Sequence, residues 1–145
     1  MIITRTPFRI SFFGGGTDYP EWFKKNGGAV ISTTIDKYCY LNLRRLPPFF
    51  DYKYRLRYFK KEEVKKIDHI KHPSIRECLK LLNFEDYGGL EIVHNADLPA
   101  LSGLGSSSTF TVSLLHALYA LKNELVTKKK LSMDAIYVER NLIKE

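Results

Sequence analysis

The sequence lacks most of the features that would place it in a specialised class of protein. It has only two cysteines, Cys39 and Cys78, with neither CxxC nor metal-binding spacing. We therefore expect free thiols in a reducing, cytoplasmic setting rather than disulfides or a zinc site. No apolar run approaches the roughly 18 residues needed to cross a bilayer, and no signal peptide is visible at the N-terminus. These absences argue against a membrane protein and a secreted one.

Negative charge is also in deficit. Lysine and arginine number 23 against 16 aspartates and glutamates, which gives a net charge of +7 over 145 residues. Such a balance suits anionic partners, either phosphorylated metabolites or nucleic acids, and does not choose between them. The 44% hydrophobic content is enough for one domain with a true core.

The order of residue patterns predicts an α+β domain spanning residues 1–145. β-Branched, aromatic or alternating segments predict strands over residues 2–13, 29–46, 52–59 and 90–94. Helices are expected over residues 19–25, 61–67, 74–82, 106–124 and from about 129 to the chain end. In the first of these we expect Trp22 and Phe23 to pack inward. The helix after residue 105 is apolar nearly all round, so we expect it to be central and buried.

The segment of residues 97–109, DLPALSGLGSSST, is the strongest candidate for a binding site. Gly103 and Gly105 allow positive φ and close approach to a ligand. The hydroxyl residues that follow open a helix whose N-terminus favours an anion. No lysine follows Gly105, which excludes a Walker loop, and Ser108 stands where a dinucleotide fingerprint needs glycine or alanine. The pattern predicts a polyphosphate-binding loop; the alternative is an ordinary turn with a serine cap.

A second candidate is Glu139 in the last predicted helix. At about 100° per residue it projects into an apolar arc, where a carboxylate is costly unless it meets a cation or a metal. The alternative is a glutamate at the rim, paired with Arg140 or a lysine. The arc is made by Leu131, Ala135, Ile136, Val138, Leu142 and Ile143.

A third candidate is the segment of residues 5–18, RTPFRISFFGGGTD, in which a strand leads into three glycines. Close approach of the backbone to another group is the usual reason for such a run. Arg9 could neutralise a phosphate, and Asp18 could accept hydrogen bonds from sugar hydroxyls. The alternative is a glycine-rich turn stabilised by the aspartate side chain.

Together these segments resemble the two N-terminal motifs of the GHMP kinases (galactose, homoserine, mevalonate and phosphomevalonate kinases). The Gly-Gly-Gly-Thr-Asp form is typical of the bacterial sugar kinases related to D-glycero-D-manno-heptose 7-phosphate kinase. The second motif matches residues 99–108 with its Gly-Leu-Gly-Ser-Ser core intact; Ser108 and Thr109 replace an alanine pair that often follows it.

The resemblance implies a fold, a reaction and a site. The fold would be the N-terminal domain shared with the second domain of a small-subunit ribosomal protein, a mixed sheet with helices packed on one side. The reaction would be phosphoryl transfer from ATP, with Mg²⁺, to a sugar or sugar phosphate. The implied residues are Arg9 at the transferred phosphoryl as catalytic residue, Ser107 and Glu139 on magnesium, Gly15, Gly16, Thr17 and Asp18 on the sugar, and Ser102, Gly103, Leu104, Gly105, Ser106, Ser107 and Ser108 around the ATP phosphates.

The family's aspartate base would stand about a dozen residues beyond Glu139, and its C-terminal domain would follow. We therefore expect an N-terminal piece of a longer kinase, with little or no turnover alone and with a tendency to self-associate through uncovered apolar surface. Two alternatives stay open: a sensor that binds nucleotide or sugar without transfer, and a basic RNA-binding module that uses exposed aromatics in residues 52–58. The resemblance favours neither nucleic acid nor membrane as a partner.

Overall fold

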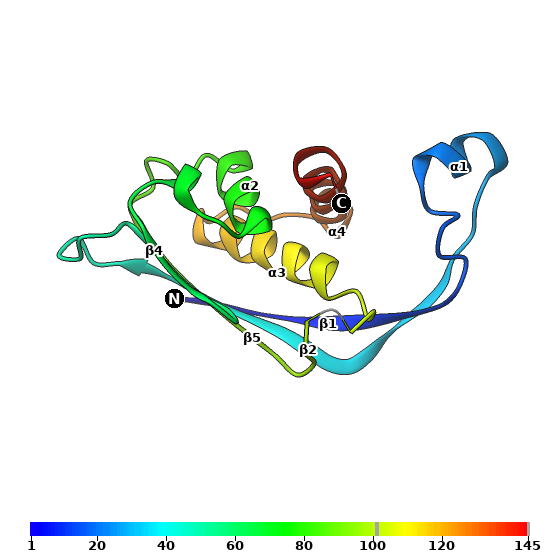
Figure 1. Cartoon of the computed structure of the whole chain (residues 1–145), viewed down its shortest axis with the longest axis horizontal. Helices are drawn as coiled ribbons and strands as arrows, with labels where there is room; N and C mark the ends of the chain where they lie inside the picture. Colours follow the sequence, from blue (N-terminus) through cyan, green and yellow to red (C-terminus); the bar gives the residue numbers. More distant parts are fainter. Residues whose placement is uncertain (101, 145) are drawn as a thin grey trace.

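A five-stranded sheet with helices on one of its faces forms the body of the protein (Figure 1). The structure is a computed structural model that describes residues 1–100 and 102–144. Leu101, within the second motif, and Glu145 lie outside the described residues. The expected α+β fold, a mixed sheet with helices packed on one side, is confirmed.

The sheet has the strand order β1-β2-β5-β3-β4. Strands β3 and β5 run parallel and the other neighbours antiparallel, so the sheet is mixed. Strand β5 therefore lies at the centre, between the long N-terminal hairpin and the short β3–β4 hairpin. The strands are β1 (Ile2–Phe13), β2 (Ile31–Leu46), β3 (Tyr54–Arg57), β4 (Lys61–Val64) and β5 (Gly89–Ala96).

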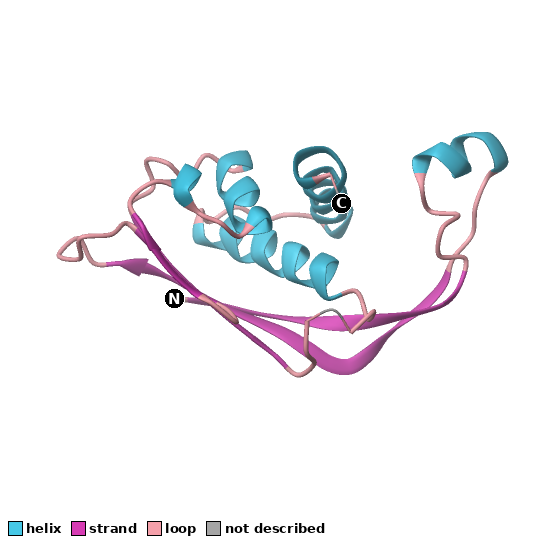
Figure 2. Cartoon of the chain, viewed as in Figure 1, coloured by secondary structure: helices cyan, strands magenta, loops and turns pink. Residues whose placement is uncertain are grey.

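The helices cover one face of the sheet, except for α1 (Pro20–Asn26), which lies apart from the others (Figure 2). The helices are α1 (Pro20–Asn26), α2 (Pro73–Leu81), α3 (Ser106–Leu121) and α4 (Lys128–Tyr137), with a 3₁₀ turn at Ile67–His69 and a π-helical segment at Val138–Ile143. None of the helices in the described residues is long and apolar enough to span a membrane.

Helix α3 is the centre of the core, as its apolar sequence predicts. Leu114, Leu115 and Leu118 are fully buried there, and the helix packs on β1 and β2. Each such leucine stabilises the fold by about 2 kcal/mol through burial. Because α3 follows directly from the serine loop, this packing also fixes the loop against the sheet.

The helix predicted over residues 61–67 is wrong. Residues Lys61–Val64 instead form β4, which pairs antiparallel with β3. Lys61 and Glu63 are exposed while Glu62 between them is buried, a period of two that belongs to a strand. The charged residues of this segment are also typical of a surface helix. In the structure its backbone N–H and C=O groups pair with those of β3 instead.

The inward packing predicted for Trp22 and Phe23 is also wrong, since these side chains are 52% and 43% exposed. Helix α1 sits at the end of an arm made by the far ends of β1 and β2, away from the helical layer (Figure 1). No core lies within its reach. Other exposed apolar side chains on this arm are Phe12, Phe13, Tyr19, Val30 and Ile31.

The last predicted helix is confirmed in position but changes form at its end. Leu131, Ala135 and Val138 are buried as the arc predicts, whereas Ile136 is 53% exposed and does not belong to it. Beyond Tyr137 the backbone continues as a π-helical segment. The wider turn rotates the following side chains relative to an α-helix and so sets how Glu139 is presented.

The exposed aromatic surface required by the RNA-binding alternative is not what the structure shows. Tyr54 is buried in the core, and Tyr58 donates its hydroxyl to Glu62. Residues 52–58 therefore form an amphipathic strand and its flanks rather than a row of stacking platforms.

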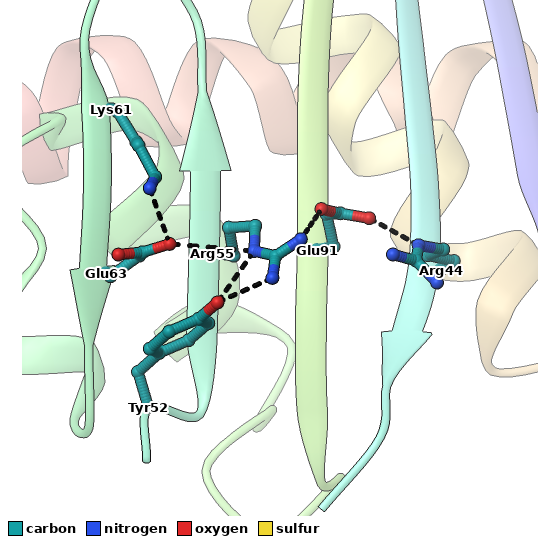
Figure 3. Close-up of polar contacts among 6 residues, drawn as sticks. All are labelled: Arg44, Tyr52, Arg55, Lys61, Glu63 and Glu91. Atoms are coloured by element: carbon teal, nitrogen blue, oxygen red, sulfur yellow. Dashed lines mark hydrogen bonds and ion pairs between the residues drawn. The ribbon is translucent and has the colours of Figure 1, made fainter. Parts of the chain in front are cut away.

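The face of the sheet away from the helices carries a ladder of alternating charges (Figure 3). Glu91 on β5 is buried and accepts hydrogen bonds from Arg44 on β2 and Arg55 on β3. Arg55 also lies beside Glu63 on β4, which pairs with Lys61 at 2.9 Å. The ladder ties four strands together across this face.

We expect Glu91→Gln to lower the free energy of unfolding by about 1–2 kcal/mol at pH 7, because it weakens two charge-assisted bonds. Burial alone raises the pKa of the Glu91 carboxyl, but Arg44 and Arg55 outweigh it and hold that pKa below its usual value. A depressed pKa stabilises the fold above the unfolded value near 4.5, and this contribution disappears as the pH falls through the folded pKa. Urea unfolding from pH 7 to 3 measures the difference in the free energy of unfolding between Glu91→Gln and the unchanged chain, and this difference should shrink below pH 4.5. The exposed Glu21→Gln should show no such difference. A difference that stays constant with pH would contradict the assignment.

Candidate functional site

The serine loop ends in a tight turn that presents the N-terminus of α3. Gly105 precedes the helix with φ 72° and ψ 33°, and Gly103 has φ 74°. Hydrogen bonds within the segment stabilise this turn. The Ser108 hydroxyl donates to the Gly105 carbonyl at 3.1 Å, and the Thr109 N–H donates to the same carbonyl at 2.9 Å. The N-terminus of a helix carries the positive end of the helix dipole, so the start of α3 is suited to an anion.

Arg9 reaches this loop from β1. Its N–H donates to the Leu104 carbonyl at 3.3 Å, just past a register shift between Pro7 and Arg9 in the β1–β2 pairing. A Cβ added to Gly105 would lie 3.3 Å from Arg9 Nη2, so the guanidinium lies close against the glycine. The strand irregularity thus places a permanent cation beside the helix N-terminus.

Glu139 and Arg140 reach the same place from the π-helical segment. With Arg9 and the loop they line a cavity of about 530 Å³. The Arg140 guanidinium lies 4.3 Å from the centre of the Tyr19 ring, so the arm also contributes to this cavity. Burial raises the pKa of the Cys78 thiol on α2, and the nearby Glu139 carboxylate raises it further. The π-helical segment packs on α2, so Glu139 lies between α2 and the loop.

A second cavity, of about 720 Å³, adjoins the first. Ser106 and Ser107 line both cavities. Sequence reasoning missed the larger one because its walls come from the β3–β4 hairpin, which was predicted partly as helix. Its lining includes Tyr58, Phe59, Lys60, Lys61, Glu62, Val64, His72, Pro73, His94 and Phe110.

Aromatic rings make up much of this larger cavity. The His72 ring stacks on Phe110 with centroids 4.9 Å apart, and His94 meets Phe110 edge-on at 5.0 Å. Burial lowers the pKa of His94, so this ring is neutral at pH 7. A slot walled partly by aromatic rings, next to a helix N-terminus, suits a planar ring that carries a phosphate chain.

A preformed metal cage is absent from the described part of the chain, where no three His, Cys, Asp or Glu side chains come together. Oxygen donors that line the smaller cavity include the hydroxyl of Ser107, an exposed residue, and the Glu139 carboxylate, beside the hydroxyls of Ser106 and Ser108. Hard oxygen donors of this kind suit Mg²⁺, which usually takes one or two protein ligands and completes its shell with phosphate oxygens and water. The donor set fits a magnesium ion that arrives with a nucleotide.

The sequence agrees with this geometry. Residues 73–144, a range that begins with α2 and includes Glu139, match the sequence profile of the family described as GHMP kinases N terminal domain. This chain carries the N-terminal domain of the GHMP kinase family. No curated protein matches the sequence at a significant level.

Solved structures share the fold of this GHMP kinase domain. A D-glycero-D-manno-heptose 1-phosphate kinase from Bacteroides thetaiotaomicron is 22% identical, with a TM-score of 0.79 over 97% of this chain and 48% of its own. A protein from Campylobacter jejuni described as a sugar kinase is 22% identical, with a TM-score of 0.78 over 99% and 46%. The mevalonate kinase of Methanococcus jannaschii is 21% identical, with a TM-score of 0.74 over 96% and 46%. The chain therefore spans about half the length of these kinases.

The GHMP kinase domain brings most of the predicted site residues together. Seven of them line the smaller cavity, namely Arg9, Gly103, Gly105, Ser106, Ser107, Ser108 and Glu139. Ser102 is exposed on the same loop, and Leu104 contributes its carbonyl to Arg9. Their roles toward ATP and magnesium remain predictions.

The residues predicted to bind the sugar lie on the arm and do not line either cavity in the described part of the chain. Asp18 Oδ1 accepts the Gly16 N–H at 3.0 Å, and the Thr17 hydroxyl donates to the carbonyls of Gly14 and Ala29 at 2.7 and 3.1 Å. A Cβ on Gly14 would come within 1.9 Å of the Ala29 oxygen. One close approach that the glycines permit is thus internal, and sugar contacts by Gly15, Gly16, Thr17 and Asp18 remain predictions.

Proposed function

We propose that this domain binds MgATP across both cavities and is the nucleotide-binding half of a sugar kinase. The nucleoside would occupy the larger, aromatic cavity, and the phosphate chain would cross Ser106 and Ser107 into the smaller one. The observation that carries this proposal is that the N-terminus of α3 borders both cavities. The smaller cavity is also lined by a cation, Arg9, and a carboxylate, Glu139. Backbone N–H groups there are suited to phosphate oxygens.

The residues of the smaller cavity suit phosphoryl transfer, which depends on position and charge neutralisation more than on covalent chemistry. Ser107 and Glu139 would hold Mg²⁺, whose charge offsets that of the phosphates. Arg9, fixed beside Gly105, would neutralise the phosphoryl group as it transfers. The acceptor would be the hydroxyl of a sugar or sugar phosphate of the heptose 7-phosphate kind.

Further parts of the proposal concern the whole protein. The relatives are about twice as long, so we expect this chain alone to show little or no turnover of a sugar. A cytoplasmic location and self-association through the apolar side chains of the arm also belong to the proposal.

Replacing Ser107 by alanine tests the proposal. We expect Ser107→Ala to weaken ATP binding about tenfold when Mg²⁺ is present and much less when it is absent, because the hydroxyl acts through the metal. Calorimetric titration of ATP into the chain measures both conditions. Ser132→Ala, which removes an exposed hydroxyl on α4 bonded to Lys129, is the matched control. If Ser107→Ala binds ATP as the unchanged chain does in both conditions, the Ser107 hydroxyl is not a ligand of Mg²⁺.

A further inference from the structure

Glu62 is a buried carboxylate in the wall of the larger cavity. Its residue is only 9% exposed, and it projects from β4 on the side of the sheet that faces α2. Three groups donate to it: the Tyr58 hydroxyl, the Lys71 N–H at 2.7 Å and the His72 N–H at 3.2 Å. Two of these donors are backbone groups of the segment that leads into α2.

The charge of Glu62 is retained at neutral pH. Burial raises the pKa of this carboxyl, but the hydrogen bonds from Tyr58 and from the two backbone N–H groups outweigh it and hold the pKa below its usual value. The nearby His72 lowers it further. The bonds to Lys71 and His72 are therefore charge-assisted, which makes them stronger than neutral ones.

The segment held by Glu62 carries one wall of the cavity. His72 precedes Pro73 at the start of α2, and its ring lies between Tyr58, at 4.8 Å edge-on, and Phe110, stacked at 4.9 Å. The ring also receives the Ile75 N–H at 3.5 Å, too long for a firm cap. The bonds to Glu62 hold the backbone of residues 71 and 72, from which this ring projects.

The carboxylate is not itself placed to bind a ligand. Oε1 accepts from Tyr58 and His72, and Oε2 accepts from Lys71, so both oxygens are already engaged. We infer that Glu62 is a positioning residue for the nucleoside end of the nucleotide: it holds residues 71 and 72 and so keeps the His72 ring in place as a wall of the slot. This inference rests on the proposed function.

The test compares two probes that differ only in the nucleoside. ATP and inorganic tripolyphosphate, each with Mg²⁺, are titrated calorimetrically into the chain and into Glu62→Gln. We expect Glu62→Gln to bind ATP about tenfold more weakly and tripolyphosphate within about twofold of the unchanged chain. Glu91→Gln is the matched control: Glu91 is also a buried carboxylate that accepts charge-assisted bonds, but it lies on the opposite face of the sheet and lines neither cavity, so its replacement should alter neither affinity.

A second variant guards against a folding defect. Tyr58→Phe removes one of the three donors and leaves the carboxylate and the ring stack, so it should weaken ATP about threefold with the same selectivity. Circular dichroism checks that each variant is folded at the temperature of titration.

The outcomes separate the two claims. If Glu62→Gln binds ATP as the unchanged chain does, or loses ATP and tripolyphosphate equally, the inference is overturned and the proposed function stands. If the unchanged, folded chain binds neither probe, the proposed function itself is wrong. A loss confined to ATP supports both.

Discussion

Replacing Gly105 by valine should weaken binding of MgATP by about a hundredfold or more. Gly105 has φ 72°, which a β-branched residue adopts only with strain of about 1–2 kcal/mol. A Cβ there would also lie 3.3 Å from Arg9 Nη2 and from Ser108 Oγ. The guanidinium is the flexible partner and would be displaced from the smaller cavity. Binding should therefore suffer from both the deformed loop and the displaced cation.

Gly103→Val is the matched control for this prediction. Gly103 has a similar φ of 74°, but an added Cβ would meet nothing within 4 Å. Both variants should lose similar stability in urea unfolding, while calorimetry should show the larger loss of ATP affinity for Gly105→Val. Equal losses of affinity would mean that strain alone matters and that Arg9 does not act beside Gly105.

Glu139→Gln should abolish most of the dependence of ATP binding on magnesium. The Glu139 carboxylate lines the smaller cavity, and a neutral amide is a poor ligand for Mg²⁺. We expect affinity for MgATP to fall about a hundredfold, whereas metal-free ATP should bind as well as before or slightly better, because a negative charge has been removed.

Calorimetric titrations with Mg²⁺ and with a chelator measure this difference. Glu124→Gln, an exposed carboxylate after α3 that lies 3.7 Å from Lys122, is the control and should leave both affinities unchanged. If Glu139→Gln binds MgATP like the unchanged chain, the metal is held elsewhere.

The parts of the fold that could be predicted are those that local pattern determines. The apolar run after Gly105 predicts a buried central helix, and α3 is one. The apolar arc of the last helix also indicated Glu139, because a carboxylate on an apolar helix face is costly unless it has a partner. These inferences need only the period of the backbone and the cost of burying charge.

The parts that failed depend on contacts between distant segments. Lys61–Val64 carries charges that fit a surface helix, and only its pairing with β3 and the burial of Glu62 make it a strand. The larger cavity was missed for the same reason, since it exists only when the β3–β4 hairpin meets α2 and α3. Trp22 looked like a core residue, yet the arm offers it no core to enter. Hydrophobicity predicts burial only where the fold supplies a partner.

Mapping MgATP onto the backbone by nuclear magnetic resonance tests the central claim most directly. The ¹H–¹⁵N signals of the isotopically labelled chain are followed as MgATP is added. We predict that the amides of residues 103–108 and the Arg9 side-chain N–H shift together and saturably with residues around the larger cavity, such as His72, while α1 (Pro20–Asn26) stays unchanged. A folded chain in which the amides of residues 103–108 do not move while MgATP binds elsewhere, or does not bind at all, would contradict the assignment of this loop.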